Sequence, residues 1–143
     1  MLESITIGIS IDRDWRDLYE AIWRPPAFPS WASGLSNASL VRQGEIWTAQ
    51  GPEGPIQIRF TDRNEFGVMD HWVDLGGGRV VYVPLRIVAN GSGAEVLLTL
   101  FRQPEMSDAK FAQDQDWGET RPAGAESAGG TLAELRVSIS ERA

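Results

Sequence analysis

The segment VMDHWVDLGGGRVVYVPLRIVANGSGAEVLLTLFR, residues 68–102, decides the fold. Two glycine-containing turns divide it into three apolar runs, which are residues 68–75, 79–89 and 94–102. Three consecutive glycines at 76–78 and the pair Asn90-Gly91 supply the positive backbone angles that tight hairpins need. The segment therefore predicts three consecutive antiparallel strands.

The residues before this segment extend the same pattern. Shorter strand candidates separated by Gly44 and by the turn sequence 51–55 are residues 39–42, 45–50 and 56–61. At the start of the chain, isoleucine occupies every second position from Ile5 to Ile11, as a strand with one buried face requires. Together these runs predict a curved, mainly antiparallel sheet of about seven strands.

Helical signals follow the first strand and the last. Apolar residues recur at helical spacing at Trp15, Leu18, Tyr19, Ile22 and Trp23, and Asp12 or Asp14 can cap this helix. Pro25 and Pro26 end it, and residues 27–34 suit a single helical turn or a structured loop. Ser107 opens a further helix from 108 to about 117. The predicted fold class is α+β, with two short helices after the first strand and a C-terminal helix.

The last part of the chain has a different composition. Residues 118–130 are rich in Gly and Ala, contain Pro122 and show no periodicity, whereas residues 131–139 fit either a short helix or a strand. We therefore expect a domain over residues 1–117. Residues 118–143 form an atypical C-terminal segment that is partly flexible or folds back.

Composition excludes several classes of function. The 143 residues contain no Cys and one His, His71, which rules out disulfides, thiolate chemistry and multi-His metal sites. The net charge is -7 and the basic residues are scattered, so no nucleic-acid partner is expected. No apolar run approaches the length of a membrane span, and the start of the chain does not have the pattern of a secretion signal. We expect a cytoplasmic protein without a metal or a cofactor.

Several short motifs resemble the START-like, or SRPBCC, superfamily of polyketide cyclases and lipid-transfer domains, in one of its uncharacterised bacterial branches. The resemblance covers residues 3–117 and is carried by the first strand and helix and by the motifs at 28–31, 51–54, 64–71, 83–86, 95–102 and 104–108. It implies a helix-grip fold with a ligand cavity between the sheet and a long C-terminal helix. Here Gly118, Pro122 and Gly124 interrupt that helix, so either the cavity is open or the tail from Thr131 completes its cover.

Strand parity places the candidate site on one apolar face of the sheet. The predicted ligand-binding residues are Phe28, Trp31, Phe60, Met69, His71, Val83, Leu85 and Leu98. Strand parity places His71 and Leu75 on this same face. His71 has the only side chain whose ordinary pKa lies near neutrality. It is either a core histidine whose ring nitrogens bond to backbone or Asp partners, or a general base or hydrogen-bond anchor for a ligand.

Arg86 lies on the opposite face by the same parity. Glu95 lies on the neighbouring strand, so the two charges can form a structural ion pair across the ladder. Alternatively, Arg86 is a polar anchor that holds a ligand carboxylate.

Three functions follow from these observations and from the resemblance. The first is binding of a small hydrophobic or amphipathic molecule between the sheet and the C-terminal helix. The alternatives are a polyketide cyclase/dehydratase-like enzyme that uses His71 as its acid-base group, and an interaction domain whose open groove receives a partner or a second copy as a homodimer. Ligand binding requires a hollow in the apolar face and an accessible imidazole.

Overall fold

The structure, a computed structural model, describes residues 1–28, 40–51, 54–104 and 107–109. Within these ranges the chain forms eight strands, one α-helix and one 3-10 helix. Their order and bounds are β1 (Ser4–Ile11), α1 (Trp15–Ile22), η1 (Pro25–Ala27), β2 (Val41–Gln43), β3 (Ile46–Gly51), β4 (Gly54–Phe60), β5 (His71–Asp74), β6 (Val80–Val83), β7 (Leu85–Asn90) and β8 (Gly93–Phe101).

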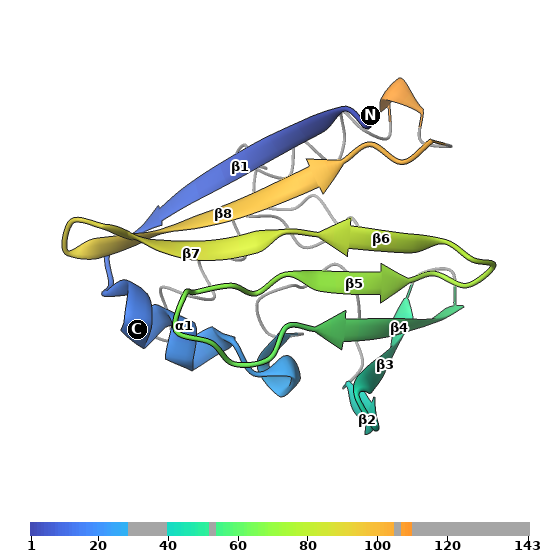
Figure 1. Cartoon of the computed structure of the whole chain (residues 1–143), viewed down its shortest axis with the longest axis horizontal. Helices are drawn as coiled ribbons and strands as arrows, with labels where there is room; N and C mark the ends of the chain where they lie inside the picture. Colours follow the sequence, from blue (N-terminus) through green and yellow to red (C-terminus); the bar gives the residue numbers. More distant parts are fainter. Residues whose placement is uncertain (29–39, 52–53, 105–106, 110–143) are drawn as a thin grey trace, which may run out of the picture.

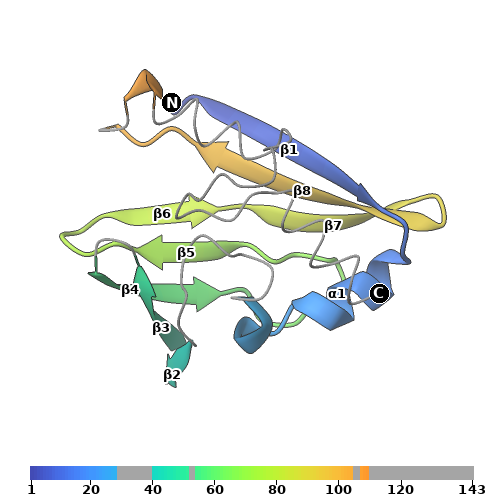
Figure 2. The same ribbon diagram turned by 180° about the vertical axis from the view of Figure 1, so that it is seen from behind.

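The strands form two antiparallel sheets that meet edge to edge. One has the order β1-β8-β7 and the other the order β2-β3-β4-β5-β6. Backbone bonds join them at the junction of β6 and β7: Met69 N–H donates to Leu85 O at 2.8 Å and Thr99 N–H to Pro84 O at 3.0 Å. Figures 1 and 2 show the two sheets running on into one another, with β2 and β3 turning away at one end.

The two glycine turns are hairpins, as the sequence predicts. Gly76, Gly77 and Gly78 all have positive φ between β5 and β6, and Gly91 has φ 57° between β7 and β8. The predicted strand 79–89 is instead two strands, because Pro84 has no N–H to donate to a ladder. This division gives eight strands within the described residues rather than about seven.

Helix α1 begins where the sequence places it. The Asp14 carboxylate accepts hydrogen bonds from the backbone N–H groups of Arg16 and Asp17, so Asp14 and not Asp12 is the cap. The helix buries Leu18, Tyr19 and Ile22. It lies against β7 and β8 near the end of the sheet where their hairpin turns (Figure 1).

Other predicted elements lie wholly or largely outside the described residues. The prolines that end α1 begin the 3-10 helix η1, and the loop beyond Phe28 is not described. Of the predicted C-terminal helix, residues 108 and 109 are described and helical. The domain boundary at 117 and the segment 118–143 are outside the described ranges.

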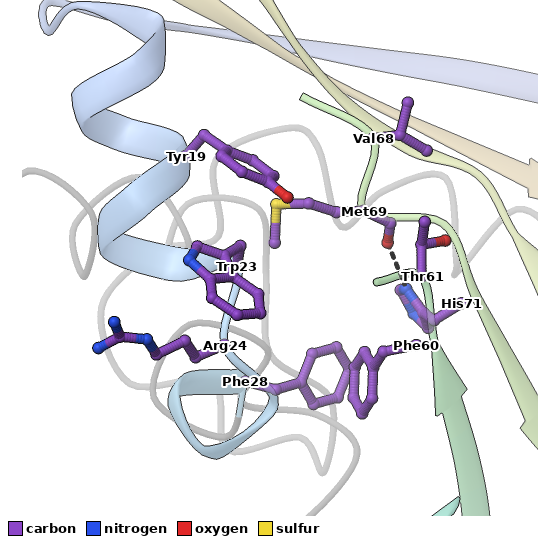
Figure 3. Close-up of a pocket in the computed structure, with 9 residues that line it drawn as sticks. All are labelled: Tyr19, Trp23, Arg24, Phe28, Phe60, Thr61, Val68, Met69 and His71. Carbon is purple, nitrogen blue, oxygen red and sulfur yellow. Dashed lines mark hydrogen bonds between the residues drawn. The ribbon is translucent and has the colours of Figure 1, made fainter. Parts of the chain in front are cut away.

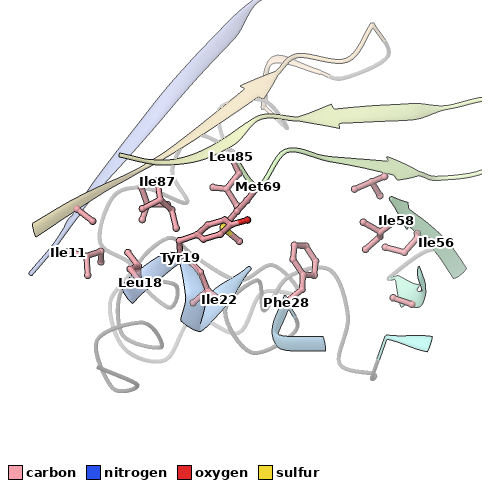
Figure 4. Close-up of a cluster of buried hydrophobic side chains, with 14 residues drawn as sticks. Ile11, Leu18, Tyr19, Ile22, Phe28, Ile56, Ile58, Met69, Leu85 and Ile87 are labelled. Carbon is pink, nitrogen blue, oxygen red and sulfur yellow. The ribbon is translucent and has the colours of Figure 1, made fainter. Parts of the chain in front are cut away.

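The core lies between α1 and the predicted apolar face of the sheet (Figure 4). Its fully buried members from the sheet include Ile58, Leu85, Ile87 and Val96. Leu75 departs from the prediction, because its side chain is 40% exposed. β5 ends at Asp74, so Leu75 belongs to the glycine turn, where its N–H donates to Arg79 O at 2.9 Å.

Candidate functional site

A small pocket lies between α1, the end of β4 and the start of β5 (Figure 3). Four of its lining side chains are aromatic rings of Phe, Tyr or Trp, from α1, from the residue directly after it, from the residue after η1 and from the end of β4. The nine lining residues are Tyr19, Trp23, Arg24, Phe28, Phe60, Thr61, Val68, Met69 and His71. The hollow has room for about one water molecule, much less than a small-molecule ligand needs.

The loop before β5 carries Val68 and Met69 to the pocket, and Asn64 shapes this loop. The Asn64 side-chain oxygen accepts hydrogen bonds from the N–H groups of Phe66 and Val68 at 3.0 and 3.1 Å, and its amide donates to Val68 O at 2.8 Å. Gly67 follows with φ 69°, and its carbonyl accepts from Ile87 N–H at 2.9 Å. A Cβ at position 67 would lie 2.2 Å from Ile87 O, so only glycine fits this approach to β7.

His71 lies at the inner end of the pocket, and 3% of the residue is exposed. Its ring packs edge to face on Phe28, with 5.2 Å between ring centroids, and tilts against Phe60 at 5.8 Å. The Nδ1 atom is 3.1 Å from the carbonyl oxygen of Met69. Among the described residues, no group forms a hydrogen bond with Nε2.

These contacts fix the protonation of the imidazole. Burial lowers the pKa of His71, against the opposing effects of the Met69 carbonyl and the Asp70 charge, so the ring is neutral at pH 7. A carbonyl oxygen only accepts, so the single ring proton resides on Nδ1. Nε2 therefore carries a lone pair that can accept a hydrogen bond or a proton.

Tyr19 is a second buried polar group in the same pocket. The residue is 3% exposed, and its hydroxyl oxygen accepts a hydrogen bond from Asn64 N–H at 2.9 Å. The sequence places Tyr19 only in the apolar stripe of the helix. The helical spacing of the apolar residues predicts that Tyr19 is buried against the sheet. It does not predict that Tyr19 lines a pocket.

Four of the predicted ligand-binding residues line the pocket together, namely Phe28, Phe60, Met69 and His71. Leu85 belongs to the closed core, and Val83 and Leu98 pack against that core half-buried. These three lie on the predicted face without lining the hollow. Trp31 is outside the described residues.

The pocket lining also includes residues that strand parity did not select. Trp23 and Arg24 follow the last turn of α1, and Thr61 and Val68 flank the loop between β4 and β5. Arg24 is exposed, and its guanidinium lies over the Trp23 ring, 5.6 Å from the centroid. Loop and helix-end residues have no alternation, so no periodic signal identifies them.

The expected pair between Arg86 and Glu95 is wrong. Across the β7–β8 ladder, Arg86 faces Leu97 and Glu95 faces Val88, so the two charges are two rungs apart on that face. Glu95 accepts instead from Ser10 Oγ at 2.7 Å and Asn90 Nδ2 at 3.2 Å. Arg86 binds Asp70 on the outer face and does not line the pocket.

Asp70 is the centre of this outer-face network. The residue is 5% exposed, and its carboxylate accepts four hydrogen bonds, two from Arg86, one from the Tyr82 hydroxyl and one from Leu85 N–H. Burial alone would raise the pKa of Asp70, but these donors outweigh burial and lower it to about 2. The network joins the residue before β5 to β6 and β7, on the side away from His71.

The described residues contain no helix long and apolar enough to cross a membrane. They also contain no group of three or more His, Asp or Glu side chains that could hold a metal ion.

Comparison with known proteins identifies a fold and no family. No family model matches the chain, and no curated protein matches it. Among solved structures, an uncharacterised protein from Bacillus thuringiensis aligns with TM-score 0.66 and 14% identity over 96% of this chain and 98% of that one. Aha1 from Colwellia psychrerythraea, whose solution structure is a dimer, aligns with TM-score 0.66 and 12% identity over 97% of both chains.

A third similar structure is DynU16, a protein of the dynemicin biosynthetic locus. It aligns with TM-score 0.61 and 14% identity over 94% of this chain and 46% of its own. Identities this low show the fold alone. The neighbours are consistent with an α+β helix-grip fold, and pairing of two copies of this chain stays a prediction.

Proposed function

We propose that the chain binds a small, largely apolar molecule, as the START-like resemblance implies, and that the aromatic pocket between α1 and the sheet receives it. The resemblance itself implies a cavity under the C-terminal helix, most of which lies outside the described residues. The observation that carries this proposal is the state of His71. It is a deeply buried imidazole with Nδ1 bonded to the backbone and Nε2 without a partner among the described residues. An acceptor nitrogen without a partner in so buried a residue can bond to a ligand group that carries a proton, and that bond would stabilise the complex.

The walls of the pocket suit an apolar ligand. Trp23, Phe28 and Phe60 present aromatic rings, and Met69 adds a flexible thioether chain. The described residues do not meet the expected requirement for a hollow and an accessible imidazole, because the hollow accepts about one water molecule and His71 is 3% exposed. A larger guest therefore requires the side chains to move. Met69 is the residue best suited to this, since its unbranched chain adopts alternative rotamers at small cost.

Equilibrium binding of the apolar fluorescent probe N-phenyl-1-naphthylamine tests the proposal. We expect saturable binding to the full chain, and a loss of affinity of about tenfold or more in Phe28→Trp, whose larger ring occupies the pocket. Phe66→Trp is the matched control, because Phe66 is 78% exposed in the loop before β5, and it should bind the probe normally. Absence of saturable binding, or equal affinity in both variants, would contradict the proposal.

A second candidate is an acid-base enzyme of the polyketide cyclase/dehydratase type. The neutral imidazole with a bare Nε2 favours it, because such a nitrogen can remove a proton from a substrate held in the pocket. The similarity to DynU16 adds the fold alone. His71→Gln separates the candidates: Gln keeps a hydrogen-bond acceptor and should retain probe binding, whereas base catalysis should fall by about a hundredfold or more.

A further inference from the structure

We propose that Asp70 is a positioning residue of the pocket: its carboxylate takes a backbone hydrogen bond that would otherwise occupy the Met69 carbonyl, and so leaves that carbonyl for the imidazole of His71. Asp70 thereby determines that the ring proton resides on Nδ1 and that Nε2 is an acceptor. The consequence for a ligand rests on the proposed function, whereas the effect of Asp70 on the ring does not.

The backbone pairing before β5 is incomplete at one position. The bridge between Val68 and Arg86 places Met69 opposite Leu85 in an antiparallel ladder, and Met69 N–H donates to Leu85 O at 2.8 Å. In the hydrogen-bonded pairs of such a ladder, the two facing residues exchange both backbone bonds. Between these two described residues, the second bond, from Leu85 N–H to Met69 O, is not formed.

The carboxylate of Asp70 takes the place of the missing acceptor. Leu85 N–H donates to Asp70 Oδ1 at 3.0 Å, on the outer face. The Met69 carbonyl oxygen is instead 3.1 Å from Nδ1 of His71, and Figure 3 shows this bond at the pocket. The donor of the ladder is thus bound on the outer face, and its acceptor is available to the imidazole on the inner face.

Contacts on both sides of Asp70 fix its carboxylate in this position. The residue is 5% exposed, and Arg86 and Tyr82 donate to the same carboxylate as Leu85 N–H. On the opposite strand edge, the N–H and the hydroxyl of Thr61 donate to the Asp70 carbonyl oxygen at 3.0 and 2.6 Å. These bonds leave the carboxylate few other positions, so Leu85 N–H stays bound to it.

Loss of the Asp70 acceptor would change what the pocket offers a ligand. A buried N–H without a partner is costly, so Leu85 N–H would turn to Met69 O, the acceptor that the ladder places opposite it. The carbonyl would then no longer hold the ring proton of His71 on Nδ1. A proton on Nε2 makes that nitrogen a donor, and the pocket would favour ligand groups that accept over groups that donate.

Two NMR measurements on the isotope-labelled full chain test the inference without a ligand. Scalar coupling across hydrogen bonds should link the Leu85 nitrogen to the side-chain carboxyl carbon of Asp70 and not to the carbonyl carbon of Met69. Long-range nitrogen spectra of the imidazole at neutral pH should show the ring of His71, the only histidine, with its proton on Nδ1. A coupling to Met69, or a ring proton on Nε2, would overturn the inference.

Three variants separate positioning from stability. Asp70→Ala removes the acceptor of Leu85 N–H, so the form with the proton on Nδ1 should no longer be the main tautomer of His71. Arg86→Leu is the matched control, because it breaks the same ion pair and keeps the acceptor. Tyr82→Phe removes a different donor from the carboxylate. Both controls should keep the native tautomer.

The outcomes distinguish this inference from the proposed function. An unchanged tautomer in Asp70→Ala, or the same change in Arg86→Leu, would overturn the inference. If Asp70→Ala does not fold, the coupling of the Leu85 nitrogen in the unmodified chain decides. Absence of probe binding, together with the expected coupling and tautomers, would contradict the proposed function alone.

Discussion

Arg86 holds the carboxylate of Asp70 through two parallel hydrogen bonds, with Nε 2.8 Å from Oδ1 and Nη2 2.7 Å from Oδ2. Both residues lie where the two sheets meet, since Asp70 precedes β5 and Arg86 belongs to β7. A planar guanidinium matches the two carboxylate oxygens, and a lysine could not form both bonds. The pair, together with Tyr82, ties three strands at the point where Pro84 interrupts the ladder.

Loss of this pair should destabilise the fold. Arg86→Leu leaves a buried carboxylate with two donors instead of four, so we expect the free energy of unfolding to fall by about 2 kcal/mol. Half of the Arg86 side chain is exposed, which keeps the effect below that of a fully buried pair. Urea denaturation measures the change. Arg59→Leu is the control: Arg59 lies over Trp72 on the same face, 4.6 Å from the ring centroid, and its loss should cost less than about 1 kcal/mol.

Because the fold favours the ionised form of Asp70, the free energy of unfolding should decrease in acid. The pKa of Asp70 is about 2 in the folded chain against 3.8 for the free side chain, so the unfolded chain takes up the proton first as pH falls. The stabilisation is complete above about pH 4 and is lost as pH falls toward 2, by about 2 kcal/mol in total. Asp70→Asn should flatten this part of the stability profile. An identical slope in the variant would show that other groups cause it.

Because the backbone of Gly67 lies close to β7, we expect that position 67 does not tolerate a side chain. Gly67→Ala combines a positive φ with a Cβ 2.2 Å from the Ile87 carbonyl oxygen, so we expect a loss of more than about 2 kcal/mol. Gly91→Ala has a similar φ in open space and should cost about 1 kcal/mol. Thermal unfolding of both variants gives the comparison. Equal losses would mean that backbone strain alone accounts for the effect.

Sequence periodicity predicts the strands and the helix well because each buries one face. The isoleucines of β1, the stripe of α1 and the glycine hairpins are local signals, and the structure follows them. The partners of Arg86 depend instead on register. Strand parity gives the correct face for Arg86, but it does not show that Arg86 and Tyr82 meet at Asp70, where Pro84 divides the strand.

The full set of residues that line the pocket is harder to predict from the sequence, because some of them lie in a loop rather than in a strand. His71 and Phe60 belong to strands with clear alternation, and the sequence brings them to one face. The sequence also places Met69 on that face. Tyr19 joins them because the loop that Asn64 and Gly67 shape against β7 bonds to its hydroxyl. A hydrogen bond between a loop amide and a tyrosine 45 residues away leaves no periodic trace in the chain.

The lowered pKa of His71 should give a second dependence of stability on pH, separate from that of Asp70. Burial lowers its pKa below the ordinary 6.5, so between 6.5 and the folded value the unfolded chain binds a proton that the folded chain does not. The free energy of unfolding is therefore highest above about pH 6.5 and decreases as pH falls below it. His71 is the only histidine, so this slope between pH 7.5 and 5 reports one side chain.

Urea denaturation across that range tests the dependence, with His71→Phe as the comparison. The variant replaces the imidazole with an apolar ring among Phe28 and Phe60, so its profile should be flat over the same range. A ligand group that donates to Nε2 requires the neutral imidazole, so its affinity should decrease in acid together with the stability of the fold. If the profile of the native chain is also flat between pH 7.5 and 5, then His71 is not held neutral by burial, and the acceptor role assigned to Nε2 fails with it.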